Sequence, residues 1–389
     1  MHVICAPDSF KESLSASAAA QAMARGVKRA MPEASVDQCP IADGGEGTVE
    51  ALINATSGQM QTTCVTGPLG AAVDAPWGWL GTSGTEGTNQ PKTAVIELAA
   101  AAGLALVPPD QRNPTRTSTY GVGELIRAAL DRGATRVLLG IGGSATNDAA
   151  CGAAQALGAR FFDANDQLIE TAIAGSDLGR INRIDLTNLH PGLDALELIV
   201  ACDVTNPLFG EQGAAYVYGP QKGATPAQIA ALDQGLRHIA PLFESHHGEP
   251  IAAMPGAGAA GGFGGGAVAL LGGRLEPGIQ RVLEAVGFRA RVANANLCLT
   301  GEGKLDVQSS SGKAISGVIE QARAQHVPVV ALAGLIDADP GALRALGLSD
   351  WQAIGEGLSA EQAMRDADRL LELATVRCLE RWRDNTNGA

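Results

Sequence analysis

Six short apolar runs in this chain are each followed by a polar bend that carries an acidic residue. The segments are HVICAPDSF, VDQCPIADGG, RVLLGIGGSATND, LELIVACDVTNP, ANLCLTGEGKLD and VPVVALAGLID, and their acids are Asp8, Asp43, Asp148, Asp203, Glu302 with Asp306, and Asp337. Helical patterns follow, one beginning near Ser15 and another near Thr48. Short apolar runs that alternate with helices are typical of a parallel sheet covered on both faces. We therefore predict an α/β fold.

The position of these acids also predicts a binding site. In open α/β sheets, ligands bind outside the carboxyl ends of the strands, which is where these acids lie in the sequence. A single aspartate after a strand is most often a helix cap. Six such positions, most with Gly, Ser, Lys or Asn beside them, favour a site over simple capping.

The length of 389 residues exceeds the size of most single cores and predicts two domains. Two regions predict β-hairpins: 67–97, with a tip at 81–90, and 158–170, turning at 164–166. The stretch 254–273 is too rich in glycine for a helix interior. We predict a discontinuous doubly wound parallel-sheet domain, 1–66 plus 256–389, with an inserted α/β domain, 67–255, that contains the hairpins. An amphipathic helix over 360–384 should close the fold.

Composition excludes several classes of protein. The net charge of −13 disfavours a nucleic-acid or anionic-membrane partner, so an anionic substrate would need local positive groups. The seven cysteines contain no C-x-x-C pair, which indicates reduced thiols rather than a zinc site or a disulfide framework. The six scattered histidines disfavour a His-based triad.

The N-terminal sequence enters a strand at once and has no basic leader segment. The longest apolar stretches fall far short of the roughly 20 residues that a membrane-spanning helix needs. We expect a soluble, cytoplasmic protein. A homodimer is compatible with the sequence, which does not determine the oligomeric state.

The segment from Gly140 to Ala145, GIGGSA, has three interpretations. It matches the dinucleotide fingerprint G-x-G-x-x-A, with Asp163 about twenty residues later, and so keeps a nicotinamide-dependent oxidoreductase open. It also suits a phosphate loop, because glycines let backbone N–H groups approach phosphate and a following helix offers its positive end. The third interpretation is a turn with a helix cap. The polar residues that follow, Ser144 to Asp148, favour the phosphate loop.

Other loops combine acids with lysines. The segment PDSFKESLSA contains Asp8, Ser9 and Lys11, and TGEGKLDVQSSSGKA contains Glu302, Lys304, Asp306 and Lys313. A lysine at such a position is a point charge for a carboxylate or a phosphate. None of these loops fits the Walker motif or the protein-kinase signatures.

Seven segments carry a resemblance to a known family: APDSFKESLSA, PIADGGEGT, RNPTRTSTYGVGELI, GIGGSATNDAACG, CDVTNPL, GPQKGA and TGEGKLD. Together, in order and over nearly the whole chain, they resemble the bacterial glycerate kinases of the class that includes glycerate 2-kinases. The resemblance implies a two-domain α/β enzyme that transfers the γ-phosphoryl group of ATP to D-glycerate with Mg²⁺, and it favours the C2 hydroxyl. The chain departs from the family pattern in two places. The polar tip SGTEGTNQ is longer than the family's loops there, and VQSSSGKA has serines in place of the usual threonine-containing version.

Phosphoryl transfer mainly requires positioning and countercharge. With the family in view, the residues are assigned as follows: Gly142, Gly143, Ser144, Thr146 and Asn147 to the phosphates; Asp148 and Asp306 to the metal; Asp8, Ser9, Lys11 and Arg116 to glycerate; and Asp203, Lys11 and Asp306 to catalysis.

The base that accepts the hydroxyl proton is Asp203 or Asp306, and we prefer Asp203. Each assignment has a simpler alternative. Lys11 could be a solvated lysine at a helix start, Arg116 could anchor its own loop, and Asp203 could cap the turn that follows it. Besides the kinase, an oxidoreductase and a non-enzymatic two-domain binding protein remain alternatives at this point.

Overall fold

The computed structural model describes residues 1–10, 13–42, 45, 47–81, 91–306 and 314–387, with the backbone alone for Asp306 and 384–387. The chain forms two compact units. The first unit contains Met1–Asp43, Glu50–Gly58 and Ile279–Ala389, and the second contains Gly44–Val49 and Gln59–Gly278. The division expected from the sequence returned to the first domain at residue 256. In the structure this return lies at Ile279.

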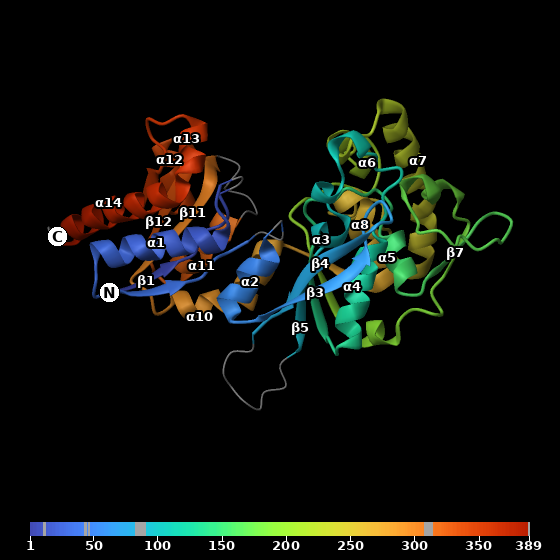
Figure 1. Ribbon diagram of the computed structural model, residues 1–389, viewed down its shortest axis with the longest axis horizontal. Helices are drawn as coiled ribbons and strands as arrows, with labels where there is room; N and C mark the ends of the chain where they lie inside the picture. Colours follow the sequence, from blue (N-terminus) through green and yellow to red (C-terminus); the bar gives the residue numbers. More distant parts are fainter. Residues whose placement is uncertain (11–12, 43–44, 46, 82–90, 307–313, 388–389) are drawn as a thin grey trace. The chain divides into compact units, whose positions relative to one another are not determined.

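The first unit is built on a five-stranded, all-parallel sheet with the order β13-β12-β11-β1-β2. Figure 1 labels its strands β1, β11 and β12. Its strands are β1 (His2–Cys5), β2 (Ser35–Gln38), β11 (Leu297–Asp306), β12 (Val329–Asp337) and β13 (Asp350–Ala353). Strand β1 lies inside the sheet, and its consecutive residues Val3, Ile4 and Cys5, which point alternately to the two faces, are all buried, as the continuous apolar run predicted. The parallel sheet confirms the predicted fold class.

Two helices that are distant in the sequence pack together over one face of this sheet. Helix α1 (Ala16–Ala30) begins after Ser15, whose Oγ accepts a hydrogen bond from Ala18 N at 3.2 Å, so the predicted cap is confirmed. Helix α14 (Ala367–Asn387) shares a core cluster with α1 and with alternate residues of the strands. A Cβ at Gly26 would lie 2.5 Å from Thr375 Cβ, so only glycine permits this close approach.

The remaining helices of the first unit connect its strands. They are α2 (Thr48–Thr56), α9 (Gly278–Ala285), α10 (Phe288–Val292), α11 (Ala314–Ala324), α12 (Pro340–Leu346) and α13 (Ala360–Arg365). Helix α11 packs on β11 and β12, and its buried residues lie outside the cluster that α1 and α14 share. The predicted closing helix over 360–384 is two helices, α13 and α14, because the backbone leaves the helix at Asp366.

The second unit has a mixed six-stranded sheet with the order β10-β9-β6-β5-β4-β3. Its strands are β3 (Gln59–Thr66), β4 (Ala72–Trp79), β5 (Thr93–Glu97), β6 (Arg136–Gly140), β9 (Glu197–Ala201) and β10 (Arg274–Glu276). The pair β4–β5 is antiparallel, as predicted for the hairpin region 67–97. Strand β3 lies before that region and also pairs antiparallel with β4, whereas β5, β6, β9 and β10 are parallel. The hairpin tip 82–90 lies outside the described residues. After strand β7 (Arg160–Phe162) the chain turns near Asp166, as predicted. Strand β7 pairs with β8 (Arg183–Asp185).

Helices α3 (Ala99–Ala102), α4 (Tyr120–Asp131), α5 (Cys151–Ala156), α6 (Ala214–Tyr218), α7 (Pro226–His247) and α8 (Ala259–Leu271) pack around this sheet. The expectation that 254–273 is too glycine-rich for a helix interior was wrong for the second part of this stretch, where residues 263–271 of α8 are helical. Ala260, Gly261 and Gly262, near the start of α8, have left-handed backbone angles that interrupt the helix. Its glycines serve close packing: a Cβ at Gly266 would lie 1.8 Å from Ala149 O, and one at Gly264 would lie 2.2 Å from Gly256 O. Strand β10 then joins the sheet, which explains why this stretch belongs to the second unit.

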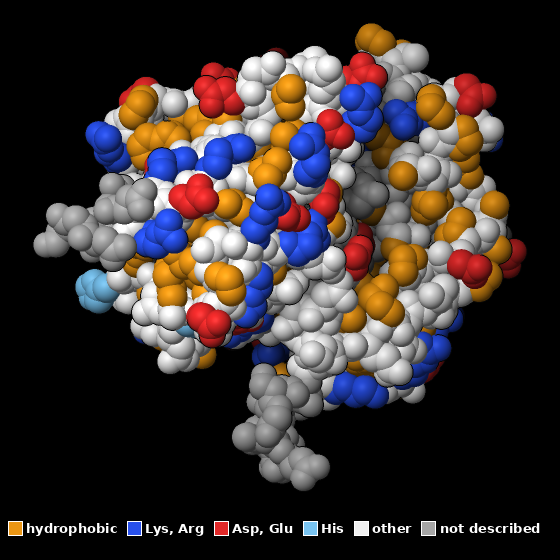
Figure 2. Space-filling view, turned by 60° about the vertical axis from the view of Figure 1, so that its left-hand side comes forward, with side chains coloured by type: hydrophobic (Ala, Val, Ile, Leu, Met, Phe, Trp, Pro, Cys, Tyr) orange, Lys and Arg blue, Asp and Glu red, His pale blue; other side chains and the backbone are white. Residues whose placement is uncertain are grey.

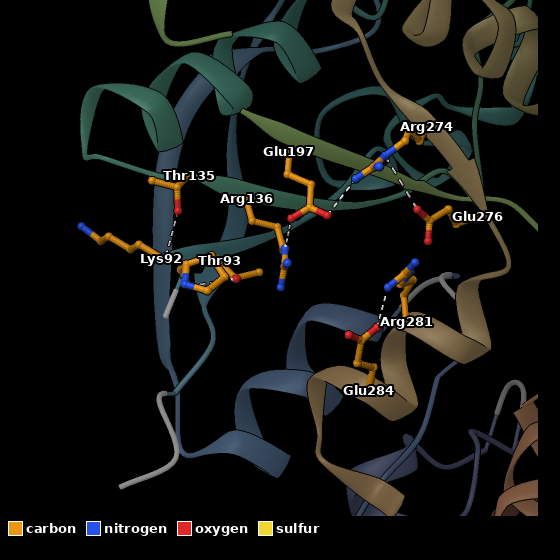
Figure 3. Close-up of polar contacts among 10 residues, drawn as sticks. Lys92, Thr93, Thr135, Arg136, Glu197, Arg274, Glu276, Arg281 and Glu284 are labelled. Carbon is orange, nitrogen blue, oxygen red and sulfur yellow. Dashed lines mark hydrogen bonds and ion pairs between the residues drawn. The ribbon is translucent and has the colours of Figure 1, made fainter. Parts of the chain in front are cut away.

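Positive and negative side chains are interspersed on the molecular surface shown in Figure 2. At the amino ends of β6, β9 and β10 they form a ladder, drawn in Figure 3. Arg136 Nε lies 2.6 Å from Glu197 Oε2, and Arg274 Nη2 lies 2.8 Å from Glu197 Oε1. The carboxylate of Glu197, on β9, therefore pairs with an arginine on each of the two neighbouring strands, β6 and β10.

Replacement of Glu197 by glutamine should have only a small effect on stability. The side chains of Arg136 and Glu197 are 34 % and 32 % exposed, and ion pairs of such exposure contribute about 1 kcal/mol or less. We expect the melting temperature to fall by less than about 4 °C in a thermal-unfolding scan. Glu249→Gln, at an exposed glutamate of the same unit, is the control. A loss of about 8 °C or more would mean that the ladder has a larger structural role.

Candidate functional site

Asp8 and Ser9 lie at the carboxyl edge of the first unit's sheet, directly after β1. Asp8 N donates to Gly301 O at 2.8 Å, which holds this loop against β11. Ser9 N donates to Asp8 Oδ1 at 2.6 Å. Both side chains are partly exposed, and they open toward a cavity. Lys11, which was assigned to glycerate, and Asp43 lie outside the described residues.

Strands β11 and β12 continue side by side past this loop, so their last residues face one another in register. Lys304 Nζ, on β11, lies 2.9 Å from Asp337 Oδ2, on β12, and both side chains are largely exposed. Asp306 is the last residue of β11 and is paired with Asp337 along the backbone. Its side chain, and the segment 307–313 with Lys313, lie outside the described residues.

A cavity of about 530 Å³ in the first unit brings these elements together. Its polar lining contains Asp8, Ser9, Ser13, Glu302 and Lys304. The sequence pointed to Asp8, Ser9, Glu302 and Lys304 from segments almost 300 residues apart. Parallel strands bring their carboxyl ends to one edge of the sheet, which explains why these segments meet.

In the second unit, the loop after β6 does not pass directly into a helix. Helix α5 begins only at Cys151, after Ala149 and Ala150, whose φ angles of 50° and 59° lie in the left-handed region. Gly142 is half-buried and Gly143 is exposed, whereas the side chains of Ser144, Thr146, Asn147 and Asp148 are all buried. The expected placement of the loop at a helix N-terminus is therefore not what the structure has. The polar side chains of the loop instead face the interior of the unit.

Asp148 is fully buried and hydrogen-bonded through one of its two oxygens. Its Oδ2 accepts from Thr119 N at 2.8 Å, Thr119 Oγ1 at 2.7 Å and Gly152 N at 3.3 Å. Burial raises the pKa of this carboxyl to about 6, against the lowering effect of the hydrogen bonds. Its Oδ1 is buried without a hydrogen-bond partner, as are both amide atoms of Asn147. Such atoms are rare in folded proteins and mark a position where a ligand can be bound.

Lys222 completes this buried cluster, and the sequence analysis did not assign it a role. Its Nζ donates to Ser144 Oγ at 3.1 Å and to Thr146 O at 2.7 Å, and the residue is 2 % exposed. Burial lowers the pKa of the ammonium group to about 7, although the charge of Asp148 raises it. One signal was visible: Lys222, in GPQKGA, is the only lysine between Lys92 and Lys304.

Asp203 follows β9, the strand next to β6, and its side chain is exposed. Its Oδ1 accepts from Gly278 N at 2.9 Å. An asparagine at position 203 would keep an oxygen that can accept this hydrogen bond. Asp148 and Asp203 therefore both follow neighbouring parallel strands of one sheet, the first buried and the second exposed. Cys202 is half-buried, and burial raises the pKa of its thiol, which disfavours a role as nucleophile.

Arg116 is exposed and lines a second cavity, of about 620 Å³, together with Arg112, Asn113, Thr225 and Gln228. Arg112 Nε is buried without a hydrogen-bond partner. The next residue after Arg116 joins this segment to the loop after β6, because Thr117 Oγ1 donates to Ala145 O at 2.8 Å. The structure thus connects Arg116 with that loop through the backbone, but Arg116 lines a cavity of its own.

Among the residues that the structure describes, no three His, Cys, Asp or Glu side chains group closely enough to form a metal site by themselves. Mg²⁺ in phosphoryl-transfer enzymes takes only one or two carboxylates, with phosphate oxygens and water as the other ligands. The Oδ1 of Asp148, which has no hydrogen-bond partner, is a carboxylate oxygen that could serve as such a ligand.

Across the same described residues, no helix is long and apolar enough to cross a membrane.

The model of the glycerate kinase family matches residues 3–383 of the chain. A glycerate kinase from Halalkalibacterium halodurans is 44% identical over 387 residues, 99% of each chain. A glycerate 2-kinase from Escherichia coli K12 is 46% identical over 348 residues, 90% of this chain and 89% of the other. The crystal structure of a protein provisionally named glycerate kinase 2, from Salmonella typhimurium LT2, is similar with a TM-score of 0.88 and 41% identity, covering 100% and 99% of the two chains.

Proposed function

This chain belongs to the glycerate kinase family, and from that premise we propose that it transfers the γ-phosphoryl group of ATP to the C2 hydroxyl of D-glycerate, with Mg²⁺. The products are 2-phosphoglycerate and ADP. The observation that carries the proposal is 46% identity to a glycerate 2-kinase over 90% of the chain. Asp8, Glu302 and Lys304, which line one cavity of the first unit, are groups of the kind that such a reaction requires.

The comparisons do not support the oxidoreductase alternative, which rested on GIGGSA. A dinucleotide loop leads directly into a helix, whose N-terminus holds the pyrophosphate. Here left-handed residues separate the loop from a short helix, and the polar side chains of the loop are buried.

For the nucleotide, we keep Gly142, Gly143, Ser144, Thr146 and Asn147 as the proposed phosphate-binding residues. The exposed backbone of Gly143 and the unsatisfied amide of Asn147 support this assignment. Lys222 donates hydrogen bonds to Ser144 Oγ and Thr146 O and so holds this part of the loop in place. Asp148 and Asp306 are the proposed ligands of Mg²⁺, which when bound offsets phosphate charge.

For D-glycerate, Asp8, Ser9 and Lys11 remain the proposed contacts, with Arg116 as a second candidate for the carboxylate. An exposed guanidinium next to a second arginine suits a carboxylate, because its fork of N–H groups donates two parallel hydrogen bonds. Asp203 remains the preferred base and Asp306 the alternative. The exposure of Asp203 supports this choice, since the base must reach the substrate hydroxyl.

The proposal predicts that the purified protein releases ADP from ATP and Mg²⁺ only when D-glycerate is added. We expect phosphorus NMR of the product to show 2-phosphoglycerate, and chelation of the metal with EDTA to abolish turnover. L-Glycerate and glycolate are the matched control substrates. Formation of 3-phosphoglycerate would overturn the C2 assignment alone, whereas no ADP release with D-glycerate would overturn the kinase assignment.

Two finer points are part of the same proposal. We place the enzyme in the cytoplasm, where ATP is its phosphoryl donor. A homodimer stays a prediction, which light scattering on a sizing column tests directly.

A further inference from the structure

The outer strand β3 of the second unit differs from the other outer strands of the two large sheets. Strands β2 and β13 have four residues each and β10 has three, whereas β3 has eight. Each of the short strands carries a carboxylate that is paired with an arginine: Asp37 with Arg291, Asp350 with Arg381, and Glu276 with Arg274. The sequence of β3, QMQTTCVT, contains neither a charged residue nor a proline. Short length and charge protect an outer strand from pairing with another chain, and β3 lacks both.

The ladder between β3 and β4 shows which backbone groups of β3 face outward. Gly67 N, directly after β3, donates to Ala71 O at 2.7 Å, so the odd-numbered residues are those that bond to β4. Thr62 lies opposite Pro76, which has no N–H, as suits a pair without mutual hydrogen bonds. The even-numbered residues of β3 therefore direct their N–H and C=O groups away from the sheet.

One of these outward positions is already satisfied within the second unit. Thr66 N donates to Glu124 Oε2, on α4, at 2.6 Å. The other three are Met60, Thr62 and Cys64, whose side chains are exposed. In the part of the chain that the structure describes, no other element bonds to the outward backbone of Thr62 or Cys64. The available edge is thus symmetric about Thr62, with one outward residue two positions away on either side.

Helix α4 lies beside β3 and gives its two ends opposite charges (Figure 1). Glu124 marks the Thr66 end. Arg132, directly after α4, marks the other end, where its Nη1 donates to Gln61 Oε1 at 3.4 Å and Gln61 Nε2 donates to Met60 O at 2.9 Å. Antiparallel pairing of two such strands brings the Arg132 end of each copy to the Glu124 end of the other. Two copies are therefore complementary in charge along this edge, although the chain has a net charge of −13.

We propose that β3 pairs antiparallel with β3 of a second copy of this chain, with the two-fold axis at Thr62. The sheet of the second unit then continues from one copy into the other, and Met60 of one copy lies opposite Cys64 of the other. This pairing names a surface for the homodimer predicted above and does not depend on the kinase function. Because the contact is one strand wide, we expect an equilibrium between one and two copies rather than a permanent dimer.

The first test is sedimentation equilibrium of the full-length protein over a dilution series. The wild-type protein should approach twice the chain mass of 39.6 kDa as its concentration rises. Thr62→Lys places two ammonium groups side by side at the axis and should raise the dissociation constant of the dimer by about tenfold or more. Thr171→Lys, at an exposed threonine outside the sheet, is the matched control and should leave this constant unchanged.

Disulfide cross-linking tests the register, and it keeps the proposal testable if Thr62→Lys does not fold. In the wild-type dimer the two Cys64 residues lie about 14 Å apart along the ladder, too far for a disulfide. Met60→Cys places a thiol opposite Cys64 of the other copy, with about 5.5 Å between the Cα atoms, which a disulfide can bridge. Mild oxidation should give a covalent dimer in this variant, but not in the wild-type protein or after Cys64→Ser is added.

A protein that stays monomeric at every concentration overturns the proposal. A dimer that Thr62→Lys leaves intact overturns it as well, because its interface then lies elsewhere. Cross-linking of the wild-type protein through Cys64, or no cross-linking of Met60→Cys, overturns the register at Thr62. ADP release with D-glycerate, measured on the same variants, tests the kinase function separately, since none of the substituted residues is assigned to that reaction.

Discussion

Replacement of Asp203 by asparagine should lower the turnover number with ATP and D-glycerate by about 100-fold or more. Positioned proton transfer typically contributes a factor of this size. Asparagine keeps the shape of the side chain and an oxygen that can accept from Gly278 N, so the loop after β9 should keep its fold. The substitution then removes little besides the basic oxygen.

Steady-state kinetics over a range of pH provide the measurement. We expect kcat to fall while the KM for D-glycerate changes by less than about threefold, because base catalysis acts on the transition state. The fall of kcat on the acidic side of the profile should disappear. Asp194→Asn, at an exposed aspartate before the opposite end of β9, is the matched control. If Asp203→Asn retains turnover within a few-fold of wild type, Asp203 is not the base and Asp306 becomes the candidate.

Replacement of Lys222 by methionine should destabilise the second unit by about 3 kcal/mol at pH 8. Methionine fills similar space, but it cannot donate to Ser144 Oγ and Thr146 O, and a buried polar group that loses its partner typically costs about 1–3 kcal/mol. In a unit of this size the melting temperature should fall by about 10 °C. The measurement is thermal unfolding without ligands and with EDTA.

The cost of Lys222→Met should grow as the pH rises. In the wild-type protein the folded-state pKa of Lys222 is about 7, below its ordinary value of 10.5. Between these values the unfolded state binds more protons than the folded state, so the stability from Lys222 increases with pH in this window. The variant lacks that increase, and the difference in melting temperature should therefore widen from pH 7 to pH 9.

Two controls separate this effect from simple loss of a side chain. Lys92→Met, at an exposed lysine of the same unit, should lower the melting temperature by less than about 3 °C. The double variant Lys222→Met with Ser144→Ala should recover part of the loss, because it no longer leaves the buried Oγ of Ser144 without this donor. A double variant that is as unstable as the sum of the two single variants would contradict the coupling.

Much of the fold could be predicted from local patterns. The strand at Val3, the Ser15 cap and the bend after β9 each depend on a few adjacent residues, and the structure has all three. The glycine-rich stretch was misjudged for a related reason. Glycine lowers helix propensity, but the close contact between Gly266 and Ala149 O comes from a segment more than a hundred residues away. Tertiary packing outweighed local preference there.

By itself, the sequence determined the alternation of strands and helices, the acidic and lysine-bearing bends at the strand ends, and the family resemblance. Only the tertiary structure decided which polar groups are desolvated. Asp203 and Asp148 follow neighbouring strands and look alike in the sequence, yet the first is exposed and the second is buried with a pKa raised to about 6. The same holds for Lys222, whose partners Ser144 and Thr146 lie 78 and 76 positions away. Burial, and with it the energy of a charge, is set by segments that only folding brings together.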